Sequence, residues 1–557
     1  MYAAASWHNQ FIYDDHEVIE KQYPIHGPAD LVEIFREPHY LNYPYYRPIT
    51  RTTFALQKTI WGDRPRPYHL FNALLAGAVM LAAWALLRRR GFMLGGTAAL
   101  VAALWLSVHP AMSECIYPAA SGRETLLPAL FILLAAWAYL GRGGAMYALA
   151  MLFFAAALLC KEQAVVVPGI FVLTDLLFPR SATASPIAPH VHAGLGSPLR
   201  LIFRYLPPLL LLLGYFAARR AIFGQPTLQW TFWQHPLEPL LSLLYGLQTA
   251  VTPFMSLFYE PTFDVWFDRW LCAGSVALLA MLVLLVLRGD SGVRRAALFW
   301  LGWFVLLQLP TAHLLKQEAP YSERYAALAI LALPATAAAV VSQFANRSAR
   351  RALAIIGCGW VIMLGYISFL RGSFYNDEIA FCLQWVRTNP ASANAHNGLA
   401  FIAQARHQQA TALAEYQIAL QLDPDSATAH NNLANLLAEQ FDFDRAMAHY
   451  EWVLRHDPKD AVAMVGYAQT LGILAVQRHD PALRDRARQL LERAIQLKPN
   501  YAQAHYIMGV WDEQFGTPQS AIAELEKALE LHPNWPDAQK RLDNLRSTKS
   551  ATRPIDG

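Results

Sequence analysis

Long apolar runs between residues 69 and 370 constrain the fold of this chain more than any other feature. A helix needs roughly 20 mostly apolar residues to cross a bilayer, so flanking residues must extend the shorter runs. Charged residues make up 15% of the 557 residues, whereas soluble domains average about a quarter. The sequence therefore predicts a multi-pass, all-α membrane domain over 70–371. The ten expected spans are 70–87, 94–108, 126–140, 145–160, 164–178, 201–218, 271–287, 296–309, 325–341 and 353–370.

The cysteine content argues against a fold held together by disulfides or a cysteine metal site, and the net charge argues against a nucleic-acid-binding protein. The cysteines are scattered, with neither a metal-binding spacing nor the pattern of a disulfide framework. A net charge of +4 is too small to indicate a nucleic-acid partner. The five cysteines are Cys115, Cys160, Cys272, Cys358 and Cys382.

The arginines of the loops predict how the chain is oriented. Cytoplasmic loops are enriched in Lys and Arg, and clusters of arginine fall in alternate loops, apart from Arg219 and Arg220. We interpret 240–258 as re-entrant or interfacial, because another span would move every later cluster to the other side. Ten spans then place residues 1–69 and the C-terminal half on the same, non-cytoplasmic face. The clusters are Arg88, Arg89 and Arg90; Arg142; Arg180 and Arg200; Arg288, Arg294 and Arg295; and Arg347, Arg350 and Arg351.

The first 69 residues form a polar segment that this orientation places outside the cytoplasm. No apolar run precedes residue 70, yet the acidic side chains would not cross a membrane unaided. We therefore expect that the chain begins late and that a preceding membrane helix is missing. The alternative is a cytoplasmic N-terminus with an inverted topology. The acidic residues are Asp14, Asp15, Glu17, Glu20, Asp30 and Glu33.

The C-terminal half is built of repeats. Pro390, Pro424, Pro458, Pro499 and Pro533 lie 34, 34, 41 and 34 residues apart, and a 34-residue helix–turn–helix is typical of tetratricopeptide repeats. The sequence predicts an α-solenoid over 390–546, with a linker and the start of the solenoid at 372–389 and a disordered tail at 547–557. Small residues that let two helices approach, and large ones that fill the groove, recur in register. They are Ala400, Ala434, Ala468 and Gly509; Ala412, Ala446, Ala487 and Ala521; and Tyr416, Tyr450, Leu491 and Leu525.

Two adjacent carboxylates, Asp14 and Asp15, stand out in the first segment, within "FIYDDHEVIE". Neighbouring side chains point to different faces in a helix or a strand, so we expect the two to have different roles. One could act as a base while the other orients it or binds a divalent cation. A solvated acidic surface is the simpler interpretation of such a pair.

Ionisable residues also gather at the outer ends of the predicted spans. Arg47, within "YPYYRP", could bind a phosphate near the lipid headgroups; an interfacial belt of arginine and aromatic residues is the alternative. Charges at membrane depth are costly and usually have a partner or a function, and local ion pairing would be the structural explanation. The other clusters are His109, Glu114, Arg123 and Glu124; Lys161 and Glu162; and Glu323 and Arg324.

The succession of "YDD", "YRP", "HLFN", "GRETLL", "KEQ" and "SERYAALAILALP", followed by the repeats, resembles the transmembrane and tetratricopeptide-repeat O-mannosyltransferases and their bacterial relatives. The resemblance runs from about residue 11 to the last repeat. It implies the GT-C membrane fold and favours a bacterial inner membrane, with the repeats on the non-cytoplasmic side. The sequence departs from the family in lacking a helix before "YDD" and a second Tyr soon after Arg324.

This resemblance implies an inverting glycosyltransferase that moves a hexose, with mannose favoured, from a polyprenyl phosphate to Ser or Thr hydroxyls of a protein. In the family the base comes from the first outer loop, which carries over to Asp14 or Asp15, with Asp15 slightly favoured. No metal ligand is assigned, and the repeats would engage the acceptor or a partner protein. The implied phosphate-binding residues are Arg47, Arg123, Lys161 and Arg324, supported by His109, Glu114, Glu124, Glu162 and Glu323.

Two other functions stay open at this point. A membrane-anchored tetratricopeptide scaffold without catalytic activity would need only the repeat array on an anchor. A transporter or lipid flippase is less favoured, because we find no inverted repeat with matched broken helices in the sequence.

Overall fold

A computed structural model describes most of the chain, in two compact units, Met1–Asn389 and Pro390–Gly557. Both units are helical, and no strand occurs among the residues described. The all-α fold class is therefore confirmed. The described residues are 1–12, 15–20, 24–25, 27–36, 39, 45–89, 92, 94–141, 143–178, 197–223, 238–251, 266–311, 323–344, 346–532 and 535–551.

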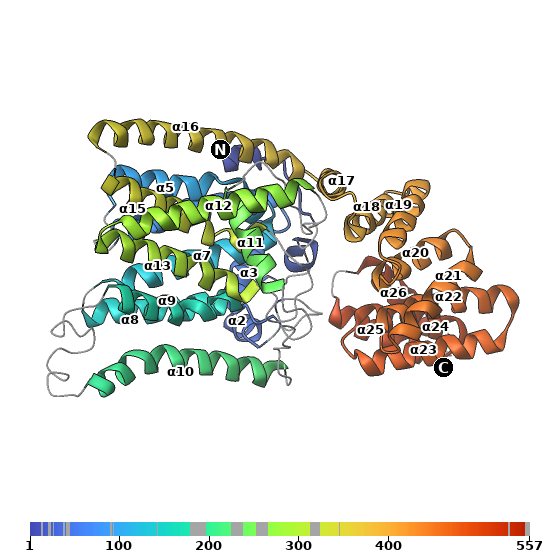
Figure 1. Cartoon of the computed structure of the whole chain (residues 1–557). Coiled ribbons are helices and arrows are strands. Elements are labelled where there is room, and N and C mark those ends of the chain that lie inside the picture. The colour runs from blue at the N-terminus through green and yellow to red at the C-terminus, as the bar shows by residue number, and fades with distance from the viewer. Residues whose placement is uncertain are drawn as a thin grey trace. The chain divides into compact units, whose positions relative to one another are not determined.

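The first unit is a bundle of long helices that run side by side (Figure 1). They are α4 (Pro65–Leu87), α5 (Gly96–Val108), α7 (Ala119–Tyr139), α8 (Gly144–Cys160), α9 (Val167–Leu177), α10 (Ser197–Phe223), α11 (Glu238–Val251), α12 (Trp266–Arg288), α13 (Ser291–Gln308), α15 (Ala332–Phe344) and α16 (Arg347–Arg371). α7 packs against both α4 and α8, and α13 packs against α9 and α15. The acidic and basic motifs belong to this part of the bundle, and α7 is its central helix.

Shorter helical elements connect the long ones. They are α1 (Tyr2–Ala5), η1 (His16–Glu20), α2 (Pro28–Ile34), α3 (Pro48–Trp61), η3 (Pro110–Met112), α6 (Ser113–Ile116), η4 (Glu162–Val166), η5 (Leu309–Thr311), α14 (Glu323–Ala326), η6 (Ala329–Leu331), η7 (Gly372–Tyr375) and α17 (Glu378–Thr388). α3 packs against η1, α4, α7 and α8. α3 thus links the N-terminal segment to the bundle, and α1 adds contacts with α4 and α16.

Four helical stretches of the described residues are long and apolar enough to cross a membrane: α4, α7, Ile202–Phe223 and Arg347–Tyr375. α5 and Pro110–Ile116 would make a fifth span, bent by 51°. The count of ten spans and the orientation stay predictions. Three shorter apolar helices are Gly144–Cys160, Leu279–Arg288 and Ala329–Gln343.

The long helices differ in how much protein covers them. In their most apolar 18-residue windows, 83% of the residues of α7 are buried, but only 17% of those of α10. On α10, Leu209, Leu210 and Leu213 are 51–56% exposed. Such leucines are stable on a membrane helix because lipid tails are as apolar as they are. α7 thus lies inside the bundle, and α10 lies at its margin (Figure 1).

The second unit is an array of antiparallel helix pairs closed by a final helix. The helices are α18 (Ala393–Ala405), α19 (Gln409–Leu422), α20 (Ala427–Glu439), α21 (Phe443–His456), α22 (Ala461–Arg478), α23 (Pro481–Leu497), α24 (Ala502–Phe515), α25 (Pro518–Leu531) and α26 (Pro536–Ala551). Consecutive helices pack on each other from α18 to α26. The predicted α-solenoid is confirmed.

The recurring small and large residues lie where the repeat register predicts. All of them are buried, with at most 1% exposure for those given a value. A Cβ at Gly509 would lie 2.8 Å from Cγ of Leu525, so a larger residue there would force a shift. The longer third repeat extends α22 and α23 to 18 and 17 residues, compared with 13 and 14 for α20 and α21.

Candidate functional site

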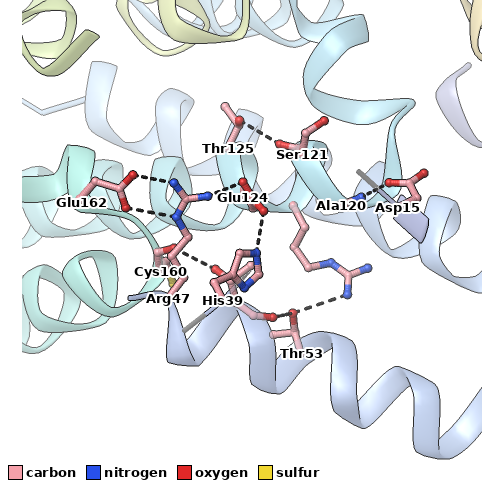
Figure 2. A network of polar contacts seen from close by, with 12 residues as sticks. Asp15, His39, Arg47, Thr53, Ala120, Ser121, Glu124, Thr125, Cys160 and Glu162 are labelled. Carbon is pink, nitrogen blue, oxygen red and sulfur yellow. Dashed lines mark hydrogen bonds and ion pairs between the residues drawn. The ribbon is translucent and has the colours of Figure 1, made fainter. Parts of the chain in front are cut away.

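Arg47 is the centre of a buried polar network at the ends of α7 and α8. Its Nε and Nη2 donate to Oε2 and Oε1 of Glu162, at 3.1 and 2.5 Å, and its Nη1 donates to Oε2 of Glu124 at 2.5 Å. Figure 2 shows the guanidinium between the two carboxylates. Arginine suits this position because its planar fork can bind one carboxylate with two parallel hydrogen bonds and still reach another.

The sequence explains why Arg47 reaches this place. Pro48 begins α3, where its missing N–H costs nothing, and Arg47 is the residue just before the helix. Glu124 lies in the first turns of α7, and Glu162 begins η4 after α8 ends at Cys160. Thr50, in the first turn of α3, donates its hydroxyl to the Cys160 carbonyl at 3.0 Å and fastens α3 to the end of α8.

His39 occupies the second oxygen of Glu124. Its Nε2 lies 2.6 Å from Glu124 Oε1, and its side chain is fully buried. Burial lowers the pKa of His39, while the Glu124 carboxylate opposes that shift. Both carboxylate oxygens of Glu124 thus have hydrogen-bond partners. Glu124 supplies a negative charge that is held in one position within the network.

Lys161 is a buried cation next to this network. It is 6% exposed, and its ammonium forms no hydrogen bond or ion pair with any residue that the structure describes. Burial lowers its pKa to about 8; the Arg47 and Arg324 guanidiniums act in the same direction, while Glu124 and Glu162 oppose them. An ammonium in such surroundings is stabilised by an additional negative charge.

Glu162 shows the opposite behaviour. Burial alone would raise the pKa of its carboxyl, but the Arg47 guanidinium, through its charge and its hydrogen bonds, and Lys161 lower it to about 2. Glu162 is therefore ionised at any physiological pH. Because both carboxylate oxygens of Glu162 accept hydrogen bonds from Arg47, Glu162 influences Lys161 only through its charge.

Glu114 and Arg324 also come together. The Arg324 backbone N–H donates to Oε2 of Glu114 at 3.1 Å, and Glu114 is 2% exposed. This contact fixes the start of α14 against α6, and it leaves the Arg324 guanidinium near enough to influence Lys161. The preceding Glu323 has a described backbone only, and the structure says nothing of its side chain.

Asp15 closes the N-terminal end of α7. Its Oδ1 accepts from Ala120 N at 2.6 Å, and its Oδ2 accepts from Ala119 N and Ile12 N, each at 3.2 Å. A carboxylate is stabilised there because the first N–H groups of a helix lack partners within the helix and carry its positive end. The neighbouring Asp14 lies outside the described residues.

Arg123 is placed differently from the other candidate cations. It is fully buried, and its guanidinium lies 4.3 and 4.4 Å from the ring centres of Phe54 and Phe71. Its Nε donates to Asn72 Oδ1 at 3.3 Å. Arg123 thus faces α3 and α4, one helical turn from the end that Asp15 closes, and its predicted contact with phosphate would need these rings to move.

Asn72 explains why the "HLFN" motif matters to this site. Its amide nitrogen donates to the carbonyls of Pro118 and Ala119, at 3.1 and 3.0 Å, which fastens α4 to the start of α7. Gly122 allows this approach, since a Cβ there would lie 2.8 Å from the Asn72 amide nitrogen and 2.6 Å from the Cys115 carbonyl. Sequence reasoning did not single out Asn72 or His39 as site residues; their position inside or beside the quoted motifs was the available signal.

His109 serves a local role in the structure. Its Nδ1 accepts from the Ala111 N–H at 3.2 Å and caps η3, and the side chain is 1% exposed. No group of three or more His, Cys, Asp or Glu side chains within the described ranges is arranged to hold a metal ion. A divalent cation at Asp14 or Asp15 therefore stays a prediction.

Known proteins resemble parts of this chain. A family model described as "TPR repeat" matches residues 405–440. Human protein O-mannosyl-transferase TMTC4 is 28% identical over 204 residues, which cover 31% of this chain and 27% of that protein. Human TMTC3 is 27% identical over 187 residues, which cover 31% of this chain and 20% of that protein. Part of the chain is thus similar to the TMTC protein O-mannosyl-transferases.

The likeness to the TMTC proteins is partial, because the chain matches about a quarter of the length of TMTC4. Independently of this likeness, the apolar helices of spanning length indicate a membrane protein. Among solved structures it is similar to the TPR protein TTC0263 of Thermus thermophilus, with 20% identity over 28% of this chain and 83% of that one and a TM-score of 0.27. PilF of Pseudomonas aeruginosa is similar at 25% identity over 29% and 71%, with a TM-score of 0.26.

Proposed function

We propose that this protein is an inverting glycosyltransferase that moves a hexose, with mannose favoured, from a polyprenyl phosphate to Ser or Thr hydroxyls of a protein. The names of the TMTC relatives support the class of reaction. The repeats support a polypeptide acceptor or partner, since such arrays bind extended chain segments. A site among membrane helices suits a donor whose prenyl tail stays in the bilayer.

One observation supports the donor most directly: Lys161 is a buried ammonium whose described surroundings include no paired carboxylate. Arg47 is already held by Glu124 and Glu162, so its charge is largely compensated. A phosphodiester beside Lys161 would supply this ammonium with a negative charge and, within reach of Arg324, receive charge-assisted hydrogen bonds. We assign the donor phosphate to these two cations, with Arg47 as the residue that holds the carboxylates in place.

The base is the second part of the proposal. The oxygens of Asp15 accept two backbone N–H groups at the start of α7 and that of Ile12, which suits a residue that positions the acidic loop. We therefore assign proton removal to Asp14 and positioning to Asp15. A carboxylate is needed because a neutral hydroxyl is a poor nucleophile.

The reaction then balances as a single displacement. The hydroxyl oxygen of the acceptor forms a bond to the anomeric carbon while its proton passes to Asp14. The bond between the anomeric carbon and the phosphate oxygen breaks, and the polyprenyl phosphate leaves with the electron pair. Attack on the face opposite the leaving group inverts the anomeric configuration. Lys161 and Arg324 stabilise the negative charge that grows on the leaving phosphate.

We further propose that the repeats and the first segment share the non-cytoplasmic face, so that the array raises the local concentration of acceptor at the site. Labelling of cysteines introduced at Asp30 and at the exposed Lys459, with a reagent that cannot cross membranes, tests this arrangement. Labelling of both from the same side supports it, and labelling from opposite sides overturns it.

The activity is tested with the full chain in liposomes, polyprenyl-phosphate mannose and a Ser/Thr peptide library, by mass spectrometry for the addition of one hexose. Lys161→Met should lower kcat/KM for the donor about 100-fold or more, and Lys161→Arg should retain much more activity. Lys459→Met, an exposed lysine of the repeats, is the matched control.

Two outcomes would contradict the proposal. Turnover that is unchanged in Lys161→Met would remove this residue from donor binding. Absence of hexose transfer in the intact protein, together with full biological activity of the repeats on an unrelated anchor, would favour the scaffold function instead.

A further inference from the structure

The corner between α3 and α4 carries a surface that the proposed reaction does not use. α3 buries Phe54 on one face, and Leu56 and Ile60, one turn apart on the opposite face, are 47% and 65% exposed. Trp61 ends the helix at 39% exposure, and Gly62, with φ of 61°, turns the chain toward α4. Four residues after α3 ends, α4 begins as an apolar span.

Two arginines of this corner have no partner of opposite charge. Arg64 and Arg66 are exposed, and neither guanidinium forms a hydrogen bond or ion pair with the described part of the chain. Lys58 differs from them because it is paired with Asp63. The Arg66 guanidinium lies 5.2 Å from the ring centre of Trp7, which is 51% exposed.

The position of Arg66 on α4 indicates which surroundings it faces. Leu70, Leu74 and Leu81 are 44%, 66% and 58% exposed, and at about 100° per residue they fall within roughly 80° of Arg66 around the helix. This stripe is the lipid-facing side of a membrane helix. Arg66 stands one turn, about 6 Å, before its first leucine, at the depth where headgroup phosphates begin.

We propose that this corner binds anionic phospholipid headgroups of the leaflet in which α4 begins. Leu56, Ile60 and the two tryptophans enter the interfacial region, where amphipathic aromatic rings are favoured, and Arg64 and Arg66 bind headgroup phosphates. We call the surface the corner patch; it consists of Trp7, Leu56, Ile60, Trp61, Arg64 and Arg66.

The phosphate that we propose at the corner patch is not the phosphate of the sugar donor, for geometric reasons. The corner patch lies at the end of α3 opposite to Arg47, and a 14-residue helix is about 21 Å long. A phosphate on Arg64 or Arg66 is therefore too far from the Arg47 network to be the one that reacts. The corner patch binds bulk lipid and fixes the end of α3, and this inference does not depend on the proposed function.

Native mass spectrometry of the full chain tests the proposal, with equimolar phosphatidylglycerol and phosphatidylcholine added to the detergent-solubilised protein. We expect the protein to retain phosphatidylglycerol preferentially. Each arginine should contribute about 1 kcal/mol, or about five-fold in affinity, so Arg64→Ala with Arg66→Ala should weaken retention about 25-fold. Arg406→Ala, an exposed arginine of the repeats without an ion pair, is the matched control and should change nothing.

A second measurement tests the depth of the patch. A spin label at Ile60→Cys, in a chain freed of its native cysteines and reconstituted in bilayers, should be more accessible to oxygen than to a water-soluble nickel chelate. A label at Val462→Cys, which is also an exposed apolar position, should show the reverse.

Three results would overturn the proposal. The double arginine variant could retain phosphatidylglycerol as the unmodified protein does. The label at Ile60→Cys could report an aqueous environment. The double variant could lose binding of polyprenyl phosphate while keeping its preference for phosphatidylglycerol, which would make the corner patch an entry point for the donor.

Discussion

Oδ1 of Asp15 accepts a 2.6 Å hydrogen bond from the backbone N–H of Ala120, 105 residues further along the chain. A side chain of the acidic motif thus completes the first turn of the helix that carries Glu124. The relationship connects two motifs that look independent in the sequence, because movement of Asp15 would move the start of α7 with it.

Asp15→Asn should loosen the first turn of α7 without unfolding the bundle. The amide keeps one acceptor oxygen but replaces the other with a donor that faces an N–H group, so we expect a loss of about 1 kcal/mol, as for other helix caps. Hydrogen exchange of residues 119–123 should increase. Asp30→Asn is the control, since Asp30 accepts from Gly27 N at the start of α2. Equal exchange of α7 in the two variants would contradict the capping role.

The two acidic residues should also differ in their effect on turnover. Asp14→Asn should reduce kcat about 100-fold or more, because it removes the proposed base. Asp15→Asn should reduce kcat less, because it changes only the position of the loop that carries Asp14. Hexose transfer at saturating donor and acceptor measures the difference, and a larger loss in Asp15→Asn would exchange the two roles.

Arg47→Met should destabilise the first unit strongly. It leaves Glu124 and Glu162 buried without their cation, and breaking a buried ion pair from one side costs about 3–5 kcal/mol. Thermal unfolding in detergent should show a lowered midpoint, which the additional changes Glu124→Gln and Glu162→Gln should partly restore. Lys58→Met removes a pair with the exposed Asp63 and should cost under about 1 kcal/mol. Similar midpoints for Arg47→Met and Lys58→Met would show that the network does not stabilise the fold.

Donor binding should weaken as the pH rises through about 8. Burial and the neighbouring guanidiniums lower the pKa of Lys161 to about 8, so its charge is present below that pH and is lost above it. If the donor phosphate binds only the charged form of Lys161, the KM for the donor should rise up to about tenfold per pH unit above this value. Lys161→Arg keeps its charge throughout, and its KM should stay flat from about pH 7 to about pH 9.5. A parallel rise in both proteins would assign the pH dependence to another group.

Phe441→Gly should stabilise the repeats. Phe441 is 72% exposed and sits in the left-handed region with φ of 63°, which costs a non-glycine residue about 1–2 kcal/mol. Glycine removes this strain but loses more entropy on folding, so we expect a net gain of about 0.5–1 kcal/mol. The thermal midpoint of the repeat unit should rise. Phe443→Gly, within α21 and 8% exposed, should lower it; a lower midpoint for Phe441→Gly would show that its ring contact with Phe443 outweighs the strain.

Much of the fold follows from periodicity in the sequence. The proline spacing and the small residues such as Ala434 and Ala468 predict the helix pairs, because each repeat contacts mainly its neighbours. Single pairs of distant residues are less predictable. His39 carries no pattern that points to Glu124, and the predicted role of Arg123 in binding phosphate meets a guanidinium enclosed by Phe54 and Phe71.

The sequence by itself determined the apolar helices, the repeat array and the set of charged residues that needed partners, since these depend on local composition and spacing. Only the tertiary structure decided the partners. Arg47 meets Glu124 and Glu162 across 77 and 115 residues, and Lys161 lies beside them with no carboxylate of its own among the described residues. Such pairings depend on how the helices pack. A buried charge without a partner is costly, and helix packing decides which side chains lie near enough to compensate it.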